Sequence, residues 1–489
     1  MTSVVFYLAA LGAILSASML LPALVAFGTN EIQIGYRLLM YGISGGFVSV
    51  SILLSIFGKT SGLERNKAIL LTVGSWVFFP LVMTLPISDL TGLSYVDAFF
   101  QSVSSITTTG ALVVENGAGV PTSIMFLLAQ IQWLGGLATL ITLILVLAPW
   151  EIGGLPQVES ASVAASIVAS QNRLVAFCGR IFRIYFGLTL ACFVLLILAG
   201  VSPLNAGIFA YTALSTGGIV PASSSIDVLL GNAGMIVMAV FLLIGATSIF
   251  WIQDIFGLEF GKLLKHRESY FILASVAAVT LYISYILIAA AGSSAILPIH
   301  TAASEGFLNA SSIVSTSAIQ SRPGVFSLLP PTFVLLMIFM GGGCYSTSGG
   351  IKFFRIGGMY SLARNELNRL LYPSVVRAGK FGNTDFDLDF MKAIWSLFAI
   401  LIATLGVITC LLSFSGLSFQ PAFTAAMAAL SNAGPLYGGF WDFSTSVQWP
   451  EYYEMSGTQK LVLSVSMILG RLEVIAVFAA LTVVLRSLR

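Results

Sequence analysis

The sequence predicts an all-α integral membrane protein with about ten transmembrane helices, and its composition and hydropathy pattern are the basis for this fold class. Of its 489 residues, 57% are hydrophobic and only 9% are charged, too few charges to cover the surface of a soluble protein of this size. The mean hydropathy is +0.97. Apolar runs of about 20 residues mark membrane-spanning helices. Such runs cover residues 3–27, 35–57, 69–88, 123–149, 181–200, 234–257, 271–292, 329–355, 390–414 and 460–485.

The first run lacks the basic n-region and small-residue cleavage site of a signal peptide, so we expect it to be retained as a helix. With a cytoplasmic N-terminus, ten crossings return the C-terminus to the cytoplasm. Most basic residues then lie on the inner face, as the positive-inside rule requires. They are Lys59, Arg65, Lys67, Arg173, Arg180, Arg183, Lys262, Lys265, Arg267, Lys352, Arg355, Arg364, Arg369, Arg377, Lys380, Lys392, Arg486 and Arg489.

The outer face has the opposite charge balance. Only Arg37, Arg322 and Lys460 fall there, and Arg471 lies within a helix. A negative outer vestibule would concentrate cations, although positive-inside sorting alone also leaves this face acidic. The acidic residues are Glu31, Asp89, Asp97, Glu115, Asp227, Glu305, Asp442, Glu451 and Glu454.

After two leading helices, the chain is predicted to repeat one unit four times: a helix, a short re-entrant segment, and a second helix. The short segments are too brief to span a bilayer and end in polar turns, as pore helices do. They lie at about 94–106, 204–214, 302–313 and 419–430. The expected divisions are 1–58 for the leading pair, 69–149, 178–258, 270–362 and 390–489 for the repeats, and 363–389 for a cytoplasmic loop.

Each short segment is followed by a hydroxyl-rich turn that usually ends in glycine. Four such turns around one axis can replace the water shell of a cation, and the helix C-termini behind them add partial negative charge. Glycine permits the positive φ that points successive carbonyls inward. The expected ion-binding residues are Thr108, Thr109, Gly110, Ser215, Thr216, Gly217, Ser315, Thr316, Ser317, Ala318, Ser431, Asn432, Ala433 and Gly434.

Four further stretches add to this pattern. They are Gln132-Trp133-Leu134-Gly135-Gly136, Gly342-Gly343-Cys344 with Ser346-Thr347-Ser348-Gly349-Gly350-Ile351-Lys352, Tyr372-Pro373-Ser374-Val375-Val376, and Leu469-Gly470-Arg471-Leu472-Glu473. Over residues 69–489 the chain resembles the membrane subunit of the Trk/Ktr/HKT superfamily of potassium transporters, most closely its Trk branch. The resemblance implies K⁺ as the transported ion, a homodimer in a bacterial inner membrane, and a cytoplasmic regulatory ring that binds nucleotide on Rossmann-like domains. This chain has no nucleotide fingerprint, so any nucleotide is expected on the partner alone.

The third turn departs from the family pattern because it lacks the terminal glycine. Alignment on the first turn places Ser317 at the glycine position, whereas alignment on the family's third repeat places Ala318 there, followed by Ile319. Either residue brings a Cβ into a turn that favours positive φ. We expect weaker discrimination of K⁺ from Na⁺, which leaves a sodium or weakly selective cation pathway as an alternative.

The second helix of repeat three is predicted to break below this turn. Its apolar part, Leu329 to Met340, is about 18 Å long and reaches roughly the bilayer midplane. The next ten residues hold five glycines and cannot continue a helix. We expect a gate that few contacts hold closed; a packing kink is the alternative. The gate residues are Gly341, Gly342, Gly343, Cys344, Ser346, Thr347, Gly349, Gly350 and Arg471.

Arg471 is expected near midplane depth, about eleven residues into the last helix, where a charge must face protein or water. It is predicted either to restrain conduction as a fixed charge in the pore or to bind carbonyls of neighbouring helices.

Other functional classes find little support. Cys178, Cys192, Cys344 and Cys410 form no close pair, the two histidines lie in different loops, and no nucleophile–base pair or metal motif is present. We therefore expect neither an enzyme nor a nucleic-acid partner. A secondary transporter coupled to H⁺ or Na⁺ remains a further alternative, although only Glu473 lies mid-helix among the acidic residues.

Overall fold

The computed structural model describes most of the chain. It covers residues 2–58, 65–114, 120–147, 154–156, 171–221, 225–257, 260–263, 266–291, 298–371, 379–381, 384–386, 388–440, 449–474, 477 and 482. Within these residues eight helices are long and apolar enough to cross a membrane, and two shorter apolar helices, Pro331–Met340 and Phe419–Leu430, accompany them. The protein is thus an all-helical membrane protein with multiple spans, as predicted.

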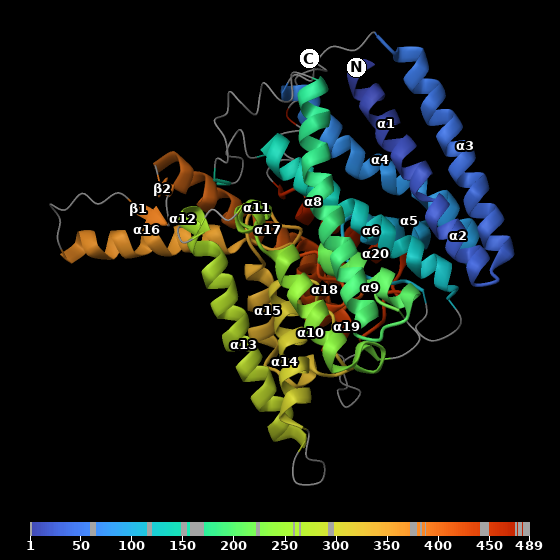
Figure 1. The fold of residues 1–489 in the computed structure, drawn as a ribbon. Coiled ribbons are helices and arrows are strands. Elements are labelled where there is room, and N and C mark those ends of the chain that lie inside the picture. Colours follow the sequence, from blue (N-terminus) through green and yellow to red (C-terminus); the bar gives the residue numbers. More distant parts are fainter. Residues whose placement is uncertain are drawn as a thin grey trace.

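The leading helices pack beside the first repeat (Figure 1). They are α1 (Thr2–Ser18), α2 (Leu20–Gly28) and α3 (Ile32–Ile56). The carboxylate of Glu31, between α2 and α3, accepts hydrogen bonds from the backbone amides of Thr122 and Ser123. Because these amides begin the second helix of repeat one and have no partner inside it, Glu31 caps that helix.

Each repeat contains an outer helix, a short pore helix and an inner helix. Repeat one has α4 (Arg65–Thr91), α5 (Tyr95–Ile106) and α6 (Thr122–Thr142), which continues as a π-helical turn over Leu143–Leu147. Repeat two has α8 (Gln171–Leu198), α9 (Pro203–Ser215) and α10 (Ile226–Ala246), followed by α11 (Ile249–Phe256) and α12 (Phe260–Leu263). Repeat three has α13 (Arg267–Ala291), α14 (Ile299–Val314), a 3-10 turn at Phe326–Leu328, α15 (Pro331–Met340) and α16 (Phe353–Leu371). Repeat four has α17 (Leu388–Phe414), α18 (Phe419–Leu430), α19 (Leu436–Gly439) and α20 (Gly457–Arg471).

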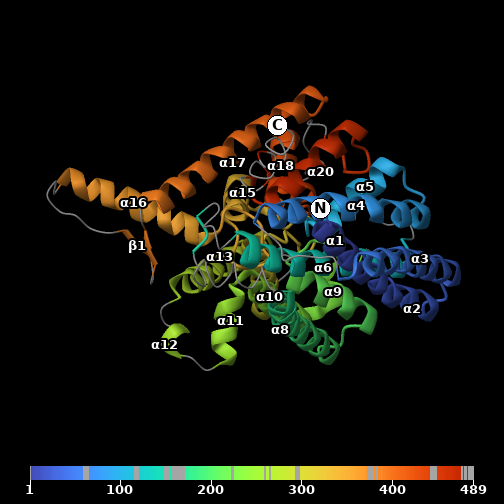
Figure 2. The same ribbon diagram turned by 90° about the horizontal axis from the view of Figure 1, so that it is seen from above.

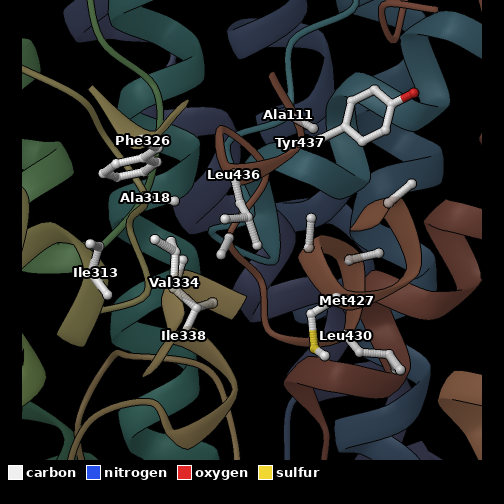
Figure 3. Packing of buried hydrophobic residues seen from close by; sticks show 14 of the residues in the cluster. Ala111, Ile313, Ala318, Phe326, Val334, Ile338, Met427, Leu430, Leu436 and Tyr437 are labelled. Carbon is white, nitrogen blue, oxygen red and sulfur yellow. The ribbon is translucent and has the colours of Figure 1, made fainter. Parts of the chain in front are cut away.

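The four repeats close into a ring. Each inner helix packs on the pore helix of its own repeat and on that of the next: α6 on α9, α10 on α14, α15 on α18, and α20 back on α5. This last contact joins the end of the chain to its beginning. Apolar side chains fill the space between repeats, and one large cluster combines residues of repeats one, three and four with Leu243 of repeat two. Figure 3 shows Ala318 and Phe326 of repeat three with Leu436 and Tyr437 of repeat four in this cluster.

Four predicted spans differ from continuous helices within the described residues. The span 3–27 is divided into α1 and α2, and the span 234–257 is broken at Thr247, which has extended backbone, between α10 and α11. The span 329–355 is broken between α15 and α16, as predicted. The span 460–485 was predicted to be one helix, but α20 ends at Arg471 and Glu473 has a left-handed φ of 55°. Arg471 is therefore the last residue of its helix, not a residue in its middle.

Helix α16 continues well into the segment predicted as a cytoplasmic loop. A two-stranded antiparallel hairpin, β1 (Gly379–Phe381) and β2 (Thr384–Phe386), follows it. Much of α16 projects away from the ring in both views (Figures 1 and 2). Its first residues, by contrast, are buried.

Candidate ion pathway

All four pore helices end in the same way. In α5, α14 and α18 the residue after the C-cap adopts a left-handed conformation, and in α9 the C-cap residue itself does. These residues are Thr108, Thr216, Thr316 and Asn432, with φ of 57°, 49°, 63° and 51°. All four are at most 1% exposed. Three of them are β-branched threonines, for which a positive φ is strained and persists only where the surrounding structure imposes it. The left-handed turn is therefore imposed by the packing of each repeat.

Backbone hydrogen bonds align the four turns. The amides of Thr109, Gly217 and Ala433 each donate to the carbonyl five residues earlier, and those of Gly110 and Ala318 donate to the carbonyl six residues earlier. Gly110, Gly218, Ala318 and Gly434 therefore occupy equivalent positions. Of the two sequence alignments of the third turn, the structure supports the one that places Ala318 at the glycine position.

Ser317 lies one position earlier, and its hydroxyl turns back to Ser312 of the pore helix at 3.1 Å. Gly217 is its counterpart in repeat two, where an added Cβ would overlap the Gln132 side chain. The residue of repeat two that is equivalent to Gly110 and Gly434 is thus Gly218, and not Gly217, which was expected from the sequence. The hydroxyls of Ser215 and Ser315, the residues just before the left-handed threonines, also bond to carbonyls of their own pore helices.

The glycine position of the aligned turns, at Gly110, Gly218, Ala318 and Gly434, takes two backbone conformations. Gly110 and Ala318 have φ of 77° and 54°, whereas Gly218 and Gly434 are not in the positive-φ region. Since repeats one and three are not neighbours in the ring, the turns have two-fold rather than four-fold symmetry at this position. The missing glycine of repeat three is an alanine in the conformation of Gly110.

The turns contact one another directly. The amide of Gly434 donates to the carbonyl of Thr109 at 2.7 Å, and the Asn432 side chain donates to the Thr109 hydroxyl at 3.0 Å. An added Cβ on Gly110 would overlap the Gly218 backbone, and one on Gly218 would overlap Pro435. The four turns therefore meet at one place, where backbone oxygens and hydroxyls are buried together.

Amide side chains brace two of the turns from behind, and the sequence analysis did not identify them. Gln101 accepts from the amide of Val113 at 3.0 Å, and Asn309 accepts from the amide of Ser321 at 3.1 Å. Gln101 and Asn309 both lie seven residues before the left-handed threonine, and both are fully buried. Their shared position, visible in the sequence once the turns are aligned, is the signal that could have found them.

The other two turns are braced by residues from outside their pore helices. Gln132 of α6 accepts from the amide of Ile219 at 3.4 Å. The Tyr452 hydroxyl donates to the carbonyl of Gly434 at 3.1 Å.

Glycines on the inner helices allow close approach to the pore helices. An added Cβ on Gly135 would overlap the carbonyl of Ile106, and one on Gly470 would overlap that of Leu430. In repeat two, a Cβ on Gly245 would lie 3.0 Å from the carbonyl of Leu214. These contacts fall two residues before each left-handed residue. They explain why glycines occur in the Gln132–Gly136 and Leu469–Glu473 stretches.

The segment between α15 and α16, residues 341–352, is a closed loop beneath the turns. Its ends are joined by backbone bonds from Ile351 to the carbonyl of Phe339, and from Lys352 to that of Met340, both 2.9 Å. The Thr347 hydroxyl bonds to the carbonyl of Leu214 at 2.9 Å. Nearly all of the loop is buried.

The loop also contacts the pore-helix ends of repeats three and four. The amide of Gly349 donates to the Thr316 hydroxyl at 2.7 Å, and a Cβ on Gly349 would overlap the carbonyl of Ser431. The expectation that few contacts hold this loop is therefore wrong, because hydrogen bonds anchor it to several repeats.

Three cations are buried around the loop. The Arg471 Nε donates to the Thr139 hydroxyl at 2.7 Å, and its Nη2 has no hydrogen-bond partner within the described residues. Lys352 donates to the carbonyl of Ser348. Arg355 pairs with Glu473 at 2.6 Å. The charge count assigned Lys352 and Arg355 to inner loops, but they are 4% and 1% exposed.

Comparison with known proteins identifies the fold and the family. A family model described as TrkH, cation transport protein, matches residues 59–487. The chain belongs to the TrkH family. The Trk system potassium uptake protein TrkH of Vibrio parahaemolyticus is 28% identical over 96% of each chain, and that of Escherichia coli K12 is 27% identical over 86% of each chain. The crystal structure of the potassium transporter TrkH from Vibrio parahaemolyticus superposes with a TM-score of 0.83 at 26% identity over 98% of both chains.

Membership of the TrkH family confirms the resemblance identified from the sequence. The protein is a cation transport protein and not an enzyme. Within the described residues, no group of three or more His, Cys, Asp or Glu side chains is arranged to hold a metal ion.

Proposed function

We propose that this chain is the membrane subunit of a Trk-type system and takes up K⁺ through a gated pore of four repeats. The observation that carries the proposal is the convergence of four pore-helix C-termini on one buried cluster of oxygens. Each helix end places about half a negative charge there. Carbonyl and hydroxyl oxygens are hard ligands that can replace the hydration shell of an alkali cation. The named relatives that match most of the chain are potassium uptake proteins.

The proposed selectivity filter comprises the four turns, from Thr108 to Gly110, Ser215 to Gly218, Ser315 to Ala318, and Ser431 to Gly434. In this structure the Thr109 carbonyl is bonded to the Gly434 amide. Passage of an ion would require this bond to open so that the oxygen turns to the cation. The compact arrangement is therefore proposed to be a non-conducting state of the filter.

The proposed gate is the loop Gly341–Gly350 with Arg471 beside it. The loop lies against the inner ends of three pore helices, so it blocks the route from the filter to the cytoplasm. The buried charges of Lys352 and Arg471 add an electrostatic barrier, because a cation that enters this region meets like charge in a poorly solvated site. A barrier of this kind acts on all permeant cations alike.

The surroundings follow from the same proposal. The N- and C-termini lie in the cytoplasm of a bacterium, the protein spans the inner membrane as a homodimer, and a cytoplasmic nucleotide-binding subunit regulates it. Basic residues such as Arg364 on α16 are the proposed contact for that subunit. K⁺ is the transported ion, and the chain itself needs no other cofactor.

Growth and flux measurements test the proposal. Expression in bacteria that lack K⁺ uptake should restore growth on low K⁺, and proteoliposomes should take up Rb⁺ faster than Na⁺. Equal Na⁺ and Rb⁺ uptake would support the weakly selective alternative that Ala318 motivates. Uptake that depends strictly on a Na⁺ or H⁺ gradient would instead support a coupled transporter, and no uptake of any monovalent cation would contradict the proposal.

The conformation of Ala318 favours K⁺ over the weakly selective alternative. Its φ of 54° lies in the same region as that of Gly110 at 77°. The third turn therefore keeps the backbone of the first turn despite its Cβ. A side chain that preserves the backbone leaves the carbonyl directions of the ring unchanged.

A further inference from the structure

Glu268 is a buried carboxylate outside the proposed filter and gate. It lies in the first turn of α13 and is 5% exposed. One oxygen, Oε1, accepts hydrogen bonds from two backbone amides, that of Cys344 at 2.8 Å and that of Phe354 at 3.1 Å. The first amide belongs to the loop and the second to the first turn of α16. A single atom therefore joins the loop to the helix that follows it.

The loop and α16 are already connected at the loop's base. Phe353 donates from its amide to the carbonyl of Gly342 at 3.0 Å, next to the two backbone bonds of Ile351 and Lys352. The rest of the loop has weaker internal support, because it contains no helix or strand. Beyond the paired base, the amides of Gly343 and Thr347 donate to the carbonyls of Ala246 and Gly245 at the end of α10, at 2.8 and 3.1 Å. Glu268 adds the bond at Cys344, which ties the same part of the loop to α13.

The α13 side of the contact is rigid. Glu268 is followed one turn later by Ile272, which is fully buried, and a Cβ on Gly343 would lie 3.2 Å from the end of the Ile272 side chain. A glycine at 343 therefore lets the loop approach α13 closely enough for the carboxylate to reach Cys344. Hydrogen bonds from amides to a carboxylate are shorter and stronger than those to neutral acceptors.

We propose that Glu268 is a positioning residue that holds the loop closed and ties its movement to α16. The inference rests on the proposed role of the loop as a gate. When α16 shifts, the Phe354 amide leaves Glu268, the bond between Phe353 and Gly342 draws the base of the loop along, and the Cys344 amide is pulled from the same oxygen, which releases the loop from α13. A partner that moves α16 would thereby open the pathway without touching the filter.

Cys344 provides a direct reporter of this event because it is 1% exposed in the closed loop. In a background with Cys178, Cys192 and Cys410 replaced by Ala, only Cys344 can react with a charged methanethiosulfonate reagent. We expect Glu268→Ala to raise the rate of Cys344 labelling and basal Rb⁺ flux in liposomes about tenfold, the change that about 1.4 kcal/mol in the loop equilibrium produces. The Rb⁺/Na⁺ ratio should stay constant. Glu268→Gln keeps an acceptor oxygen and should give intermediate values.

Glu31→Ala is the matched control. Glu31 also accepts from two backbone amides at a helix start, those of Thr122 and Ser123, but it lies beside the leading helices and not beside the loop. It should lower thermal stability without exposing Cys344. Wild-type labelling rates in both Glu268 variants would overturn the proposal, as would equal increases in Glu31→Ala. If the wild type carries no cation flux, the proposed function fails while the labelling rates still decide the role of Glu268.

Discussion

Repeats one and three differ from repeats two and four in how each holds its turn. In repeats one and three an amide side chain of the same pore helix, Gln101 or Asn309, binds the backbone that follows the turn. In repeats two and four the corresponding support comes from other elements, Gln132 of α6 and Tyr452 before α20. The first pair is braced by a residue of its own pore helix, and the second pair by a residue outside that helix, which lies in repeat one for Gln132 and in repeat four itself for Tyr452.

The same division appears in the reason for each glycine. At Gly110 a positive φ of 77° makes glycine the favoured residue. At Gly434, where φ is not positive, the reason is space, because a Cβ would overlap the backbone of Ala111. Position 318 has only the conformational requirement, and alanine can meet it at a modest cost. One sequence pattern, a turn that ends in glycine, thus serves two physical needs.

The largest loss of ion flux is expected at a glycine that has a positive φ and also lacks space for a Cβ. Gly110 has positive φ and touches the Gly218 backbone, so Gly110→Val should abolish selective flux. A β-branched residue at this φ costs about 1–3 kcal/mol in strain alone, and the overlap forces the two turns apart. Rb⁺ uptake by purified protein in liposomes measures the loss.

Gly92→Val is its control, since Gly92 has a similar φ of 73° but open space around it. This variant should fold less stably and still transport. Normal, selective uptake by a folded Gly110→Val protein would show that the turns do not form the filter.

Crowding alone is tested at Gly434. Gly434→Ala adds one methyl group without a conformational penalty, yet that group would overlap the Ala111 backbone. We expect Rb⁺ flux to fall about tenfold, since overpacking in a tight site costs roughly 1–3 kcal/mol. Gly438→Ala in α19, where nothing lies within 4 Å of the added Cβ, should be neutral. Similar flux in the two variants would contradict the division into conformational and steric glycines.

The internal braces are expected to have a smaller effect. Gln101→Leu or Asn309→Leu leaves a buried backbone amide without an acceptor, which costs about 1–3 kcal/mol. Each should lower the melting temperature and reduce the Rb⁺/Na⁺ uptake ratio, because the carbonyls of its turn become mobile.

Gln130→Leu is the matched control for these variants. Gln130 lies on α6 and bonds to the carbonyl of Ser18 in the leading helices, so its loss should affect stability but not the ratio. A ratio that falls equally in all three variants would show that the braces have no specific link to the filter.

Hydropathy predicted the fold well because a bilayer imposes strict lengths on helices. The short pore helix expected at 94–106, for example, was found as Tyr95–Ile106. The burial of Lys352 and Arg355 was not predicted, because a Gly-rich segment with basic residues is equally consistent with an exposed loop on the inner face. Their burial depends on contacts with repeats distant in sequence. The braces escaped notice for a similar reason, because a glutamine inside a pore helix shows no partner until the turn folds back on it.

Backbone shape is a further property that residue types alone did not decide. From the sequence, either Ser317 or Ala318 could occupy the glycine position of the third turn, and a Cβ at that position was expected to distort the turn. The hydrogen-bond register selects Ala318 and shows that its φ of 54° lies in the same region as that of the first turn. The departure from the family pattern is therefore a change of residue within a preserved backbone.

The smallest effect is accordingly expected for Ala318→Gly. Glycine removes a left-handed penalty of about 1–2 kcal/mol for a residue with a Cβ, but it also frees the unfolded chain by about 0.4–1 kcal/mol, so stability should change by less than about 1 kcal/mol. The Rb⁺/Na⁺ ratio should stay within about twofold of the wild type, because 1.4 kcal/mol would be needed for a tenfold change. Ala318→Val provides the contrast and should reduce the ratio strongly, as β-branched residues rarely adopt this conformation. A large rise in selectivity for Ala318→Gly would show that the methyl group, although buried in the cluster around Phe326, distorts the pathway after all.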